Sequence, residues 1–129
     1  MSHRVVTFLV LAFVVTLGVD SSWAHHNRSD IDMTKRIMLT GTLTMVDWRN
    51  PHIEVSIEVK GPTGTPESWT IESAAPSALA ARGITKAMVA KAVGQTVSVE
   101  VSIAKDGSRA AVGWKITFPG GNAVVMREA

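Results

Sequence analysis

The sequence predicts a mainly β fold with a minor helical part: an OB-fold-like, five-stranded Greek-key barrel. Three observations predict it. Alternating apolar and polar residues indicate strands in the order β-β-β-α-β-β. The first strand is long and contains Gly41, which favours a bulge or a sharp bend. The Asp106-Gly107 pair indicates a hairpin turn between the last two strands. A bent first strand and a helix after the third strand are typical of an OB-fold, and a generic α+β meander is the competing architecture.

The inward-facing residues of each strand follow from the alternation. They are Ile37, Leu39, Leu43 and Met45; Ile53, Val55, Ile57 and Val59; Trp69 and Ile71; Val97, Val99, Val101 and Ile103; and Ala110, Val112, Trp114, Ile116 and Phe118. A two-residue turn at Asp106-Gly107 predicts four pairs in the last hairpin. These pairs are Ile103 with Ala110, Val101 with Val112, Val99 with Trp114, and Val97 with Ile116.

The segment from Pro76 to Ala92 is rich in helix-forming residues and predicts a helix in two parts. Gly83 is expected to divide it, Thr85 to cap the second part, and Gly94 to end it. A short additional strand is expected at Ala123 to Met126.

Residues 1–24 have the pattern of a cleaved signal peptide. Arg4 gives a basic start, Val5 to Val19 is an uncharged apolar run, and Ser22 and Ala24 are the small residues before the cleavage site. A membrane anchor is the competing interpretation, but a spanning helix needs about 20 apolar residues and this run ends at Asp20. We therefore expect a periplasmic or secreted protein with no stable membrane anchor after processing.

The remaining chain is expected to contain a flexible polar lead-in, residues 25–36, and one barrel domain, residues 37–129. The chain has no cysteine, which excludes disulfides, a cysteine nucleophile and thiolate metal sites. Its net charge of +2 is too small to indicate a nucleic-acid partner. Common hydrolase, nucleotide-binding and metalloprotease motifs are absent, so no enzyme is predicted. Glu54, Glu58 and Glu72 could form a carboxylate pair across strands, but a solvated polar face is the favoured interpretation.

The histidines are the candidate metal ligands. Cleavage after Ala24 makes His25 the first residue, and its terminal amine and imidazole can then chelate one metal ion. One further imidazole gives three nitrogen ligands, a set that suits Cu(II). His52 is the candidate third ligand because it follows the rigid Asn50-Pro51 corner, and His26 competes with His25. The alternative is a solvated His25-His26 terminus, with His52 only hydrogen-bonding the turn.

Methionines offer softer ligands for Cu(I), and they are Met33, Met38 and Met45, although Met45 is expected in the core. The runner-up site is the corner formed by Trp48, Arg49 and Asn50. Trp48 is the tryptophan expected at the surface, where OB barrels use aromatic residues to contact ligands. This site indicates an interaction module for an unknown protein or a glycan, without metal.

Four stretches resemble a family of small exported bacterial proteins classed as a domain of unknown function. They are Ala24-His25-His26, Val46 to His52 (VDWRNPH), Glu72-Ser73 with Pro76, Leu79 and Gly83, and Ala104 to Ser108 (AKDGS). The Trp-x-Asn-Pro-His corner is the most specific of them. The resemblance implies export and an OB-like barrel, and it implies no activity. The family's terminal His-His and corner histidine correspond to His25, His26 and His52. Residues 27–33 depart from the family because they lack an aromatic residue often found there.

Overall fold

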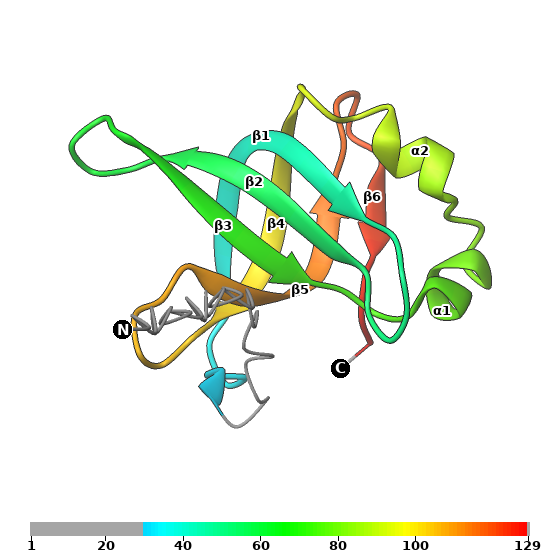
Figure 1. Cartoon of the computed structure of the whole chain (residues 1–129), viewed down its shortest axis with the longest axis horizontal. Helices are drawn as coiled ribbons and strands as arrows, with labels where there is room; N and C mark the ends of the chain where they lie inside the picture. The colour runs from blue at the N-terminus through cyan, green and yellow to red at the C-terminus, as the bar shows by residue number, and fades with distance from the viewer. Residues whose placement is uncertain (1–29, 129) are drawn as a thin grey trace, which may run out of the picture.

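A computed structural model describes residues 30–128, and their strands close into a five-stranded mixed β-barrel (Figure 1). The barrel strands are β1 (Ile37–Asp47), β2 (Glu54–Lys60), β3 (Pro66–Glu72), β4 (Thr96–Ile103) and β5 (Ala110–Thr117). Two short helices, α1 (Pro76–Ala80) and α2 (Lys86–Ala90), lie between β3 and β4, and β6 (Ala123–Val125) follows β5. The OB-like barrel and its strand–helix order are therefore confirmed.

One parallel pair closes the barrel. The hydrogen-bonded order is β3-β2-β1-β4-β5-β6, and the two ends of the barrel meet where β3 pairs with the first half of β5. In that pair Glu72 lies beside Val112. The second half of β5 pairs with β6 instead, from Lys115 to Thr117. The expected short strand at the tail is thus present, and it extends the sheet beyond the barrel.

β1 is bent because its two halves pair with different neighbouring strands. Its first half pairs with β4 and its second half with β2, and Thr42 takes part in both ladders. Gly41 lies at the bend, where a Cβ atom would collide with the backbone carbonyl of Glu58. The bulge expected near this glycine occurs slightly later, at Thr44. The extra residue changes the alternation. Val46 therefore packs against the core, whereas Met45 is 46% exposed and its predicted place in the core is wrong.

The predicted register of the β4–β5 hairpin is also wrong. A two-residue turn of the expected type needs a positive φ at both Asp106 and Gly107, but only Gly107 has one, at 79°. The loop is longer, and Ala104 N–H donates to the Ala110 carbonyl at 3.0 Å. A bulge at Trp114 then shifts the register again. The observed pairs are Ile103 with Ala111, Ser102 with Val112, Val101 with Gly113, and Val99 with Ile116.

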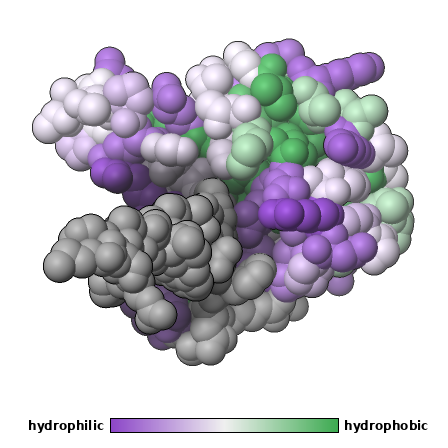
Figure 2. Space-filling view, viewed as in Figure 1, coloured by the Kyte–Doolittle hydropathy of each residue, from purple (hydrophilic) through white to green (hydrophobic). Residues whose placement is uncertain are grey.

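The helical insert has the two-part form that was predicted. Gly83 divides it with a φ of 76°, and Gly94 ends it with a φ of 86°. The Thr85 hydroxyl accepts a hydrogen bond from Met88 N–H at 3.2 Å and caps α2. The insert lies at one end of the barrel, and the β2–β3 hairpin projects on the other side. Apolar surface is visible beside α2 (Figure 2).

The core fills the barrel with aliphatic side chains. The largest fully buried ones are Leu43, Ile53, Val55, Ile57, Ile71, Val97, Val99 and Val101. Trp69 packs against them as predicted. Trp114 is buried, but it lies outside this main cluster because it is the bulged residue of β5. Its indole N–H donates to the Ser102 hydroxyl at 2.9 Å, and the Arg36 guanidinium lies 4.0 Å from its ring centre.

The described part of the lead-in, residues 30–36, is held against the outside of β4 and β5. Asp32 N–H donates to the Ile103 carbonyl at 3.0 Å, and the Ser102 hydroxyl donates to the Lys35 carbonyl at 2.7 Å. Ile31 is 4% exposed and packs with Ala104 and Val112. This segment therefore buries apolar surface and satisfies backbone hydrogen-bonding groups at the edge of the barrel.

Residues 25–29 of the lead-in and the predicted signal peptide lie outside the described residues. No helix within residues 30–128 has the length and apolar character needed to span a bilayer.

Candidate functional site

The corner between β1 and β2 places His52 beside the end of β3. The corner contains a cis Asn50-Pro51 peptide bond. Immediately after it, Ile53 N–H donates to the Ala74 carbonyl at 3.0 Å, and Ser73 N–H donates to the Ile53 carbonyl at 2.7 Å. These bonds extend the β2–β3 ladder past both strand ends. Glu72 is consequently brought next to His52.

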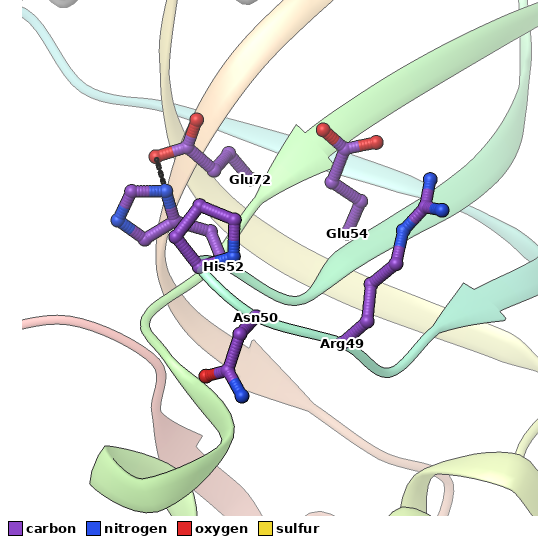
Figure 3. A pocket seen from close by; sticks show the side chains of 6 residues that line it. Arg49, Asn50, His52, Glu54 and Glu72 are labelled. Atoms are coloured by element: carbon purple, nitrogen blue, oxygen red, sulfur yellow. Dashed lines mark ion pairs between the residues drawn. The ribbon is translucent and has the colours of Figure 1, made fainter.

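A polar hollow of about 310 Å³ lies at this corner (Figure 3). Its lining residues are Arg49, Asn50, Pro51, His52, Glu54 and Glu72. Glu54 on β2 and Glu72 on β3 are direct cross-strand partners. Their carboxylates lie on the same side of the corner, while Asn50 points the other way. This corner pocket therefore presents one imidazole and two carboxylates from three successive parts of the chain.

Glu72 is the central contact of the corner pocket. Its Oε1 lies 3.4 Å from His52 Nδ1 and 3.1 Å from Arg127 Nη2. Arg127 also donates to the Ser73 carbonyl at 3.0 Å, and its side chain is only 11% exposed. The largely buried guanidinium of Arg127 therefore holds the Glu72 carboxylate in place. The same carboxylate contacts His52 Nδ1 and orients the imidazole ring.

His52 keeps one ring nitrogen available to a ligand. Its side chain is 37% exposed, and the nitrogen that does not face Glu72 points away from that carboxylate. A histidine that binds a metal commonly offers its second ring nitrogen to a carboxylate or carbonyl, which orients the ring. The contact between His52 and Glu72 has this arrangement.

The charges of the corner pocket favour a cation. Two carboxylates directly opposite each other repel, and Arg127 contacts only Glu72 of the two. Arg49, which is 75% exposed, forms its ion pair with Asp47 at 2.8 Å. Within residues 30–128, Glu54 forms no ion pair. A bound cation would relieve the repulsion between the two carboxylates.

The structure describes only part of the predicted metal set. His52 lies in the corner pocket, whereas His25 and His26 are outside the described residues. Residues 30–128 contain no group of three His, Asp or Glu side chains that could hold a metal ion by themselves. Of the candidate methionines, Met38 and Met45 are exposed on β1, and Met33 packs with the Ile31 cluster. None of the three lines the corner pocket.

The runner-up set is brought together only in part. Arg49 and Asn50 are exposed and line the corner pocket. Trp48 is half-buried and packs against the barrel core, so only part of its side chain is accessible. The physical reason is the bulge at Thr44, after which Val46 and Trp48 both pack against the core.

Sequence reasoning missed the roles of Glu72 and Arg127. The sequence indicates Glu72 as a polar-face residue or as one of a cross-strand carboxylate pair, and the structure does pair it with Glu54. Its contact with His52 is not indicated, because that contact depends on the β2–β3 register. Arg127 lies after β6, where its N–H donates to the Trp114 carbonyl at 3.3 Å. No local sequence pattern indicates that contact.

A model of a family of unknown function, DUF6152, matches residues 12–115. The matched range includes the corner, the helical insert and β1 to β4, and it stops near the end of β5. The searches of curated proteins and of solved structures found no match. Because the family model matches well over half of the sequence, the chain belongs to the DUF6152 family, a family of unknown function.

Proposed function

We propose that this chain is an exported, non-enzymatic binding module, and that the corner pocket holds Cu(II) through His52 and the processed N-terminus. The observation that carries the proposal is the position of His52. Glu72 contacts one of its ring nitrogens at 3.4 Å, and the side chain is 37% exposed beside two carboxylates. Export is supported by the basic start, apolar run and small residues of positions 1–24.

The ligand set would be three nitrogen atoms. The terminal amine and the imidazole of His25 supply two, and His52 supplies the third through the nitrogen that faces away from Glu72. Such a set suits Cu(II). His26 is the competing imidazole. The carboxylate of Glu72 would orient His52 and increase its basicity.

The length of the lead-in is compatible with this arrangement. Ile31 packs against Val112, and Val112 is paired with Glu72, the residue that contacts His52. Neighbouring strands are about 4.8 Å apart, so the anchored part of the lead-in ends within a few strand spacings of the corner pocket. Residues 25–29 can span up to about 17 Å when extended. That length supports an approach of His25 to His52.

A protein- or glycan-interaction module at the same corner is the second candidate. The exposure of Arg49 and Asn50 favours it, because both side chains are available to a polar partner. The packing of Trp48 against the core weakens it, because the aromatic surface needed for stacking is largely covered. The metal proposal needs no contribution from Trp48.

Isothermal titration of Cu(II) into the processed protein, residues 25–129, tests the proposal. We expect one tight site, and we expect affinity to fall by more than about tenfold in His52→Ala. Acetylation of the His25 terminal amine should cause a similar loss, because the resulting amide nitrogen no longer offers a lone pair to the metal. Glu58→Gln, an exposed β2 change outside the corner pocket, is the matched control and should bind as the parent does. Equal affinity of all four proteins would contradict the proposal.

A further inference from the structure

A second hollow, separate from the corner pocket, lies between α2 and the loop that joins β5 to β6. It has a volume of about 290 Å³, and Met88, Lys91, Phe118 and Val124 are among its lining residues. A narrow apolar seam lined by Leu79, Val89, Phe118 and Val124, among others, adjoins it. The hollow shares no lining residue with the corner pocket. Apolar surface, bordered by polar side chains, is visible in this region in Figure 2.

The helical insert leaves this surface incompletely covered. α2 has only five residues, and Val89 is its one buried side chain. Met88, on the same helix, is 49% exposed and faces the hollow, and Phe118 is half-buried. Exposed apolar surface of this kind costs free energy in water, and a concave apolar site near 300 Å³ is within the range that accepts small ligands.

The two segments that line the hollow carry only positively charged side chains. Residues 73–99 contain Arg82, Lys86 and Lys91 and no acidic residue, and residues 117–126 are uncharged. Arg82 is engaged by Glu128 at 3.4 Å. Lys91 lines the hollow and forms no ion pair within residues 30–128. The hollow therefore combines an apolar floor with one available ammonium group at its border.

We propose that this hollow binds a single-chain anionic amphiphile, with the acyl chain beside Met88 and Phe118 and a carboxylate head group at Lys91. Charge complementarity selects the anionic head group. The concave shape selects a single chain over a bilayer surface, since an interfacial helix needs a projecting apolar face. This inference is independent of copper binding.

Titration of sodium decanoate into the processed protein, followed by amide NMR shifts, tests this inference. We expect saturable one-to-one binding below the micelle concentration, with the largest shifts in α2 and in the β5–β6 loop. Lys91→Glu should weaken binding by about tenfold or more, because it replaces the attraction by repulsion. Lys86→Glu is the matched control, because it reverses a charge at the other end of α2 from Lys91, outside the hollow, and it should change affinity by less than about twofold.

A second pair of variants and two further probes complete the test. Met88→Asp should abolish saturable binding, whereas Val93→Asp should not, because Val93 is similarly exposed at 44% but lies outside the hollow. Decyltrimethylammonium, which has a chain of the same length and the opposite charge, should bind more weakly than decanoate. Equal losses in Lys91→Glu and Lys86→Glu would overturn the proposal. Binding to anionic phospholipid vesicles without saturable binding of decanoate would also overturn it, since that result indicates a membrane surface as the partner.

Discussion

At the scale of single residues, the geometry of the corner pocket depends on Glu72, whose carboxylate contacts two other side chains. One oxygen of its carboxylate lies within 3.4 Å of both His52 and Arg127. His52 was identified as a candidate from the sequence, because it follows a rigid corner on the polar face of a strand. Its orientation was not predictable, because Glu72 is 20 positions further along the chain, and Arg127 is added only by the strand after the barrel.

The first prediction concerns the carboxylate that orients His52. Glu72→Gln should lower Cu(II) affinity by about 10- to 100-fold, as is typical when a group that orients a metal ligand is changed. Glu54→Gln is the matched control, because Glu54 lines the same corner pocket and does not contact His52. It should have the smaller effect. Equal losses in the two variants, measured by calorimetry, would show that Glu72 contributes only charge.

Two closely packed glycines, Gly41 and Gly113, give the second prediction. A Cβ at Gly41 would collide with the backbone carbonyl of Glu58, whereas a Cβ at Gly113 would meet the side chains of Ile71 and Met126. Side chains can move, but the backbone of a paired strand moves with difficulty. Gly41→Ala should therefore lower the free energy of unfolding by about 1–3 kcal/mol, and by more than Gly113→Ala does. Urea denaturation at 25 °C measures both, and the opposite ranking would contradict the account of the β1 bend.

At the scale of elements, strand identity was predictable and strand register was not. The strands and the two-part helix follow from alternation and from Gly83, Thr85 and Gly94. The register depends on bulges at Thr44 and Trp114, whose causes are tertiary. Each extra residue moves the following side chains to the opposite face. The alternation therefore misplaces Met45, which is 46% exposed, whereas Trp114 is buried as predicted but lies outside the main core cluster.

The third prediction concerns the attachment of the lead-in to β4 and β5. The Ser102 hydroxyl donates to the Lys35 carbonyl and accepts from the Trp114 indole, and Ser102 is fully buried. Ser102→Ala leaves both partners unsatisfied and should cost about 1–3 kcal/mol of unfolding free energy. Ser98→Ala, a more exposed change on the same strand, should cost less than about 1 kcal/mol. Chemical denaturation checks both, and a neutral Ser102→Ala would contradict the described packing.

The fourth prediction is that low pH weakens the attachment of residues 30–36 to the barrel. The Thr34 hydroxyl donates to the Asp32 carboxylate, which lowers the pKa of Asp32 below its ordinary value of 3.8, with Lys35 and Lys105 acting in the same direction. A lowered folded-state pKa gives stabilisation that is present above pH 3.8 and is lost as the pH falls through the folded-state pKa. NMR titration of Asp32 should show the lowered pKa. The exchange of Thr34 N–H should accelerate with acid relative to an unstructured peptide, and an unshifted pKa would contradict this prediction.

At the scale of the whole molecule, the barrel keeps two different surfaces apart. The corner pocket presents His52 and two carboxylates beside the end of β3. The hollow between α2 and the β5–β6 loop presents apolar side chains and Lys91. The order of strands and helix was sufficient to predict the OB-like barrel, because few topologies place one helix after three strands with a bent first strand. The positions of the two surfaces were not predictable, because each joins segments that are distant in the sequence. The corner pocket joins the β1–β2 corner to the end of β3, and the hollow joins α2 to the β5–β6 loop.

Electron paramagnetic resonance of the processed protein with one equivalent of Cu(II) tests the central claim most directly. Nitrogen superhyperfine structure should show three coordinated nitrogen atoms in the parent protein. In His52→Ala the same spectrum should show two, because the terminal amine and the His25 imidazole remain. A parent spectrum that His52→Ala leaves unchanged would contradict the claim that the corner pocket and the processed N-terminus together form a copper site.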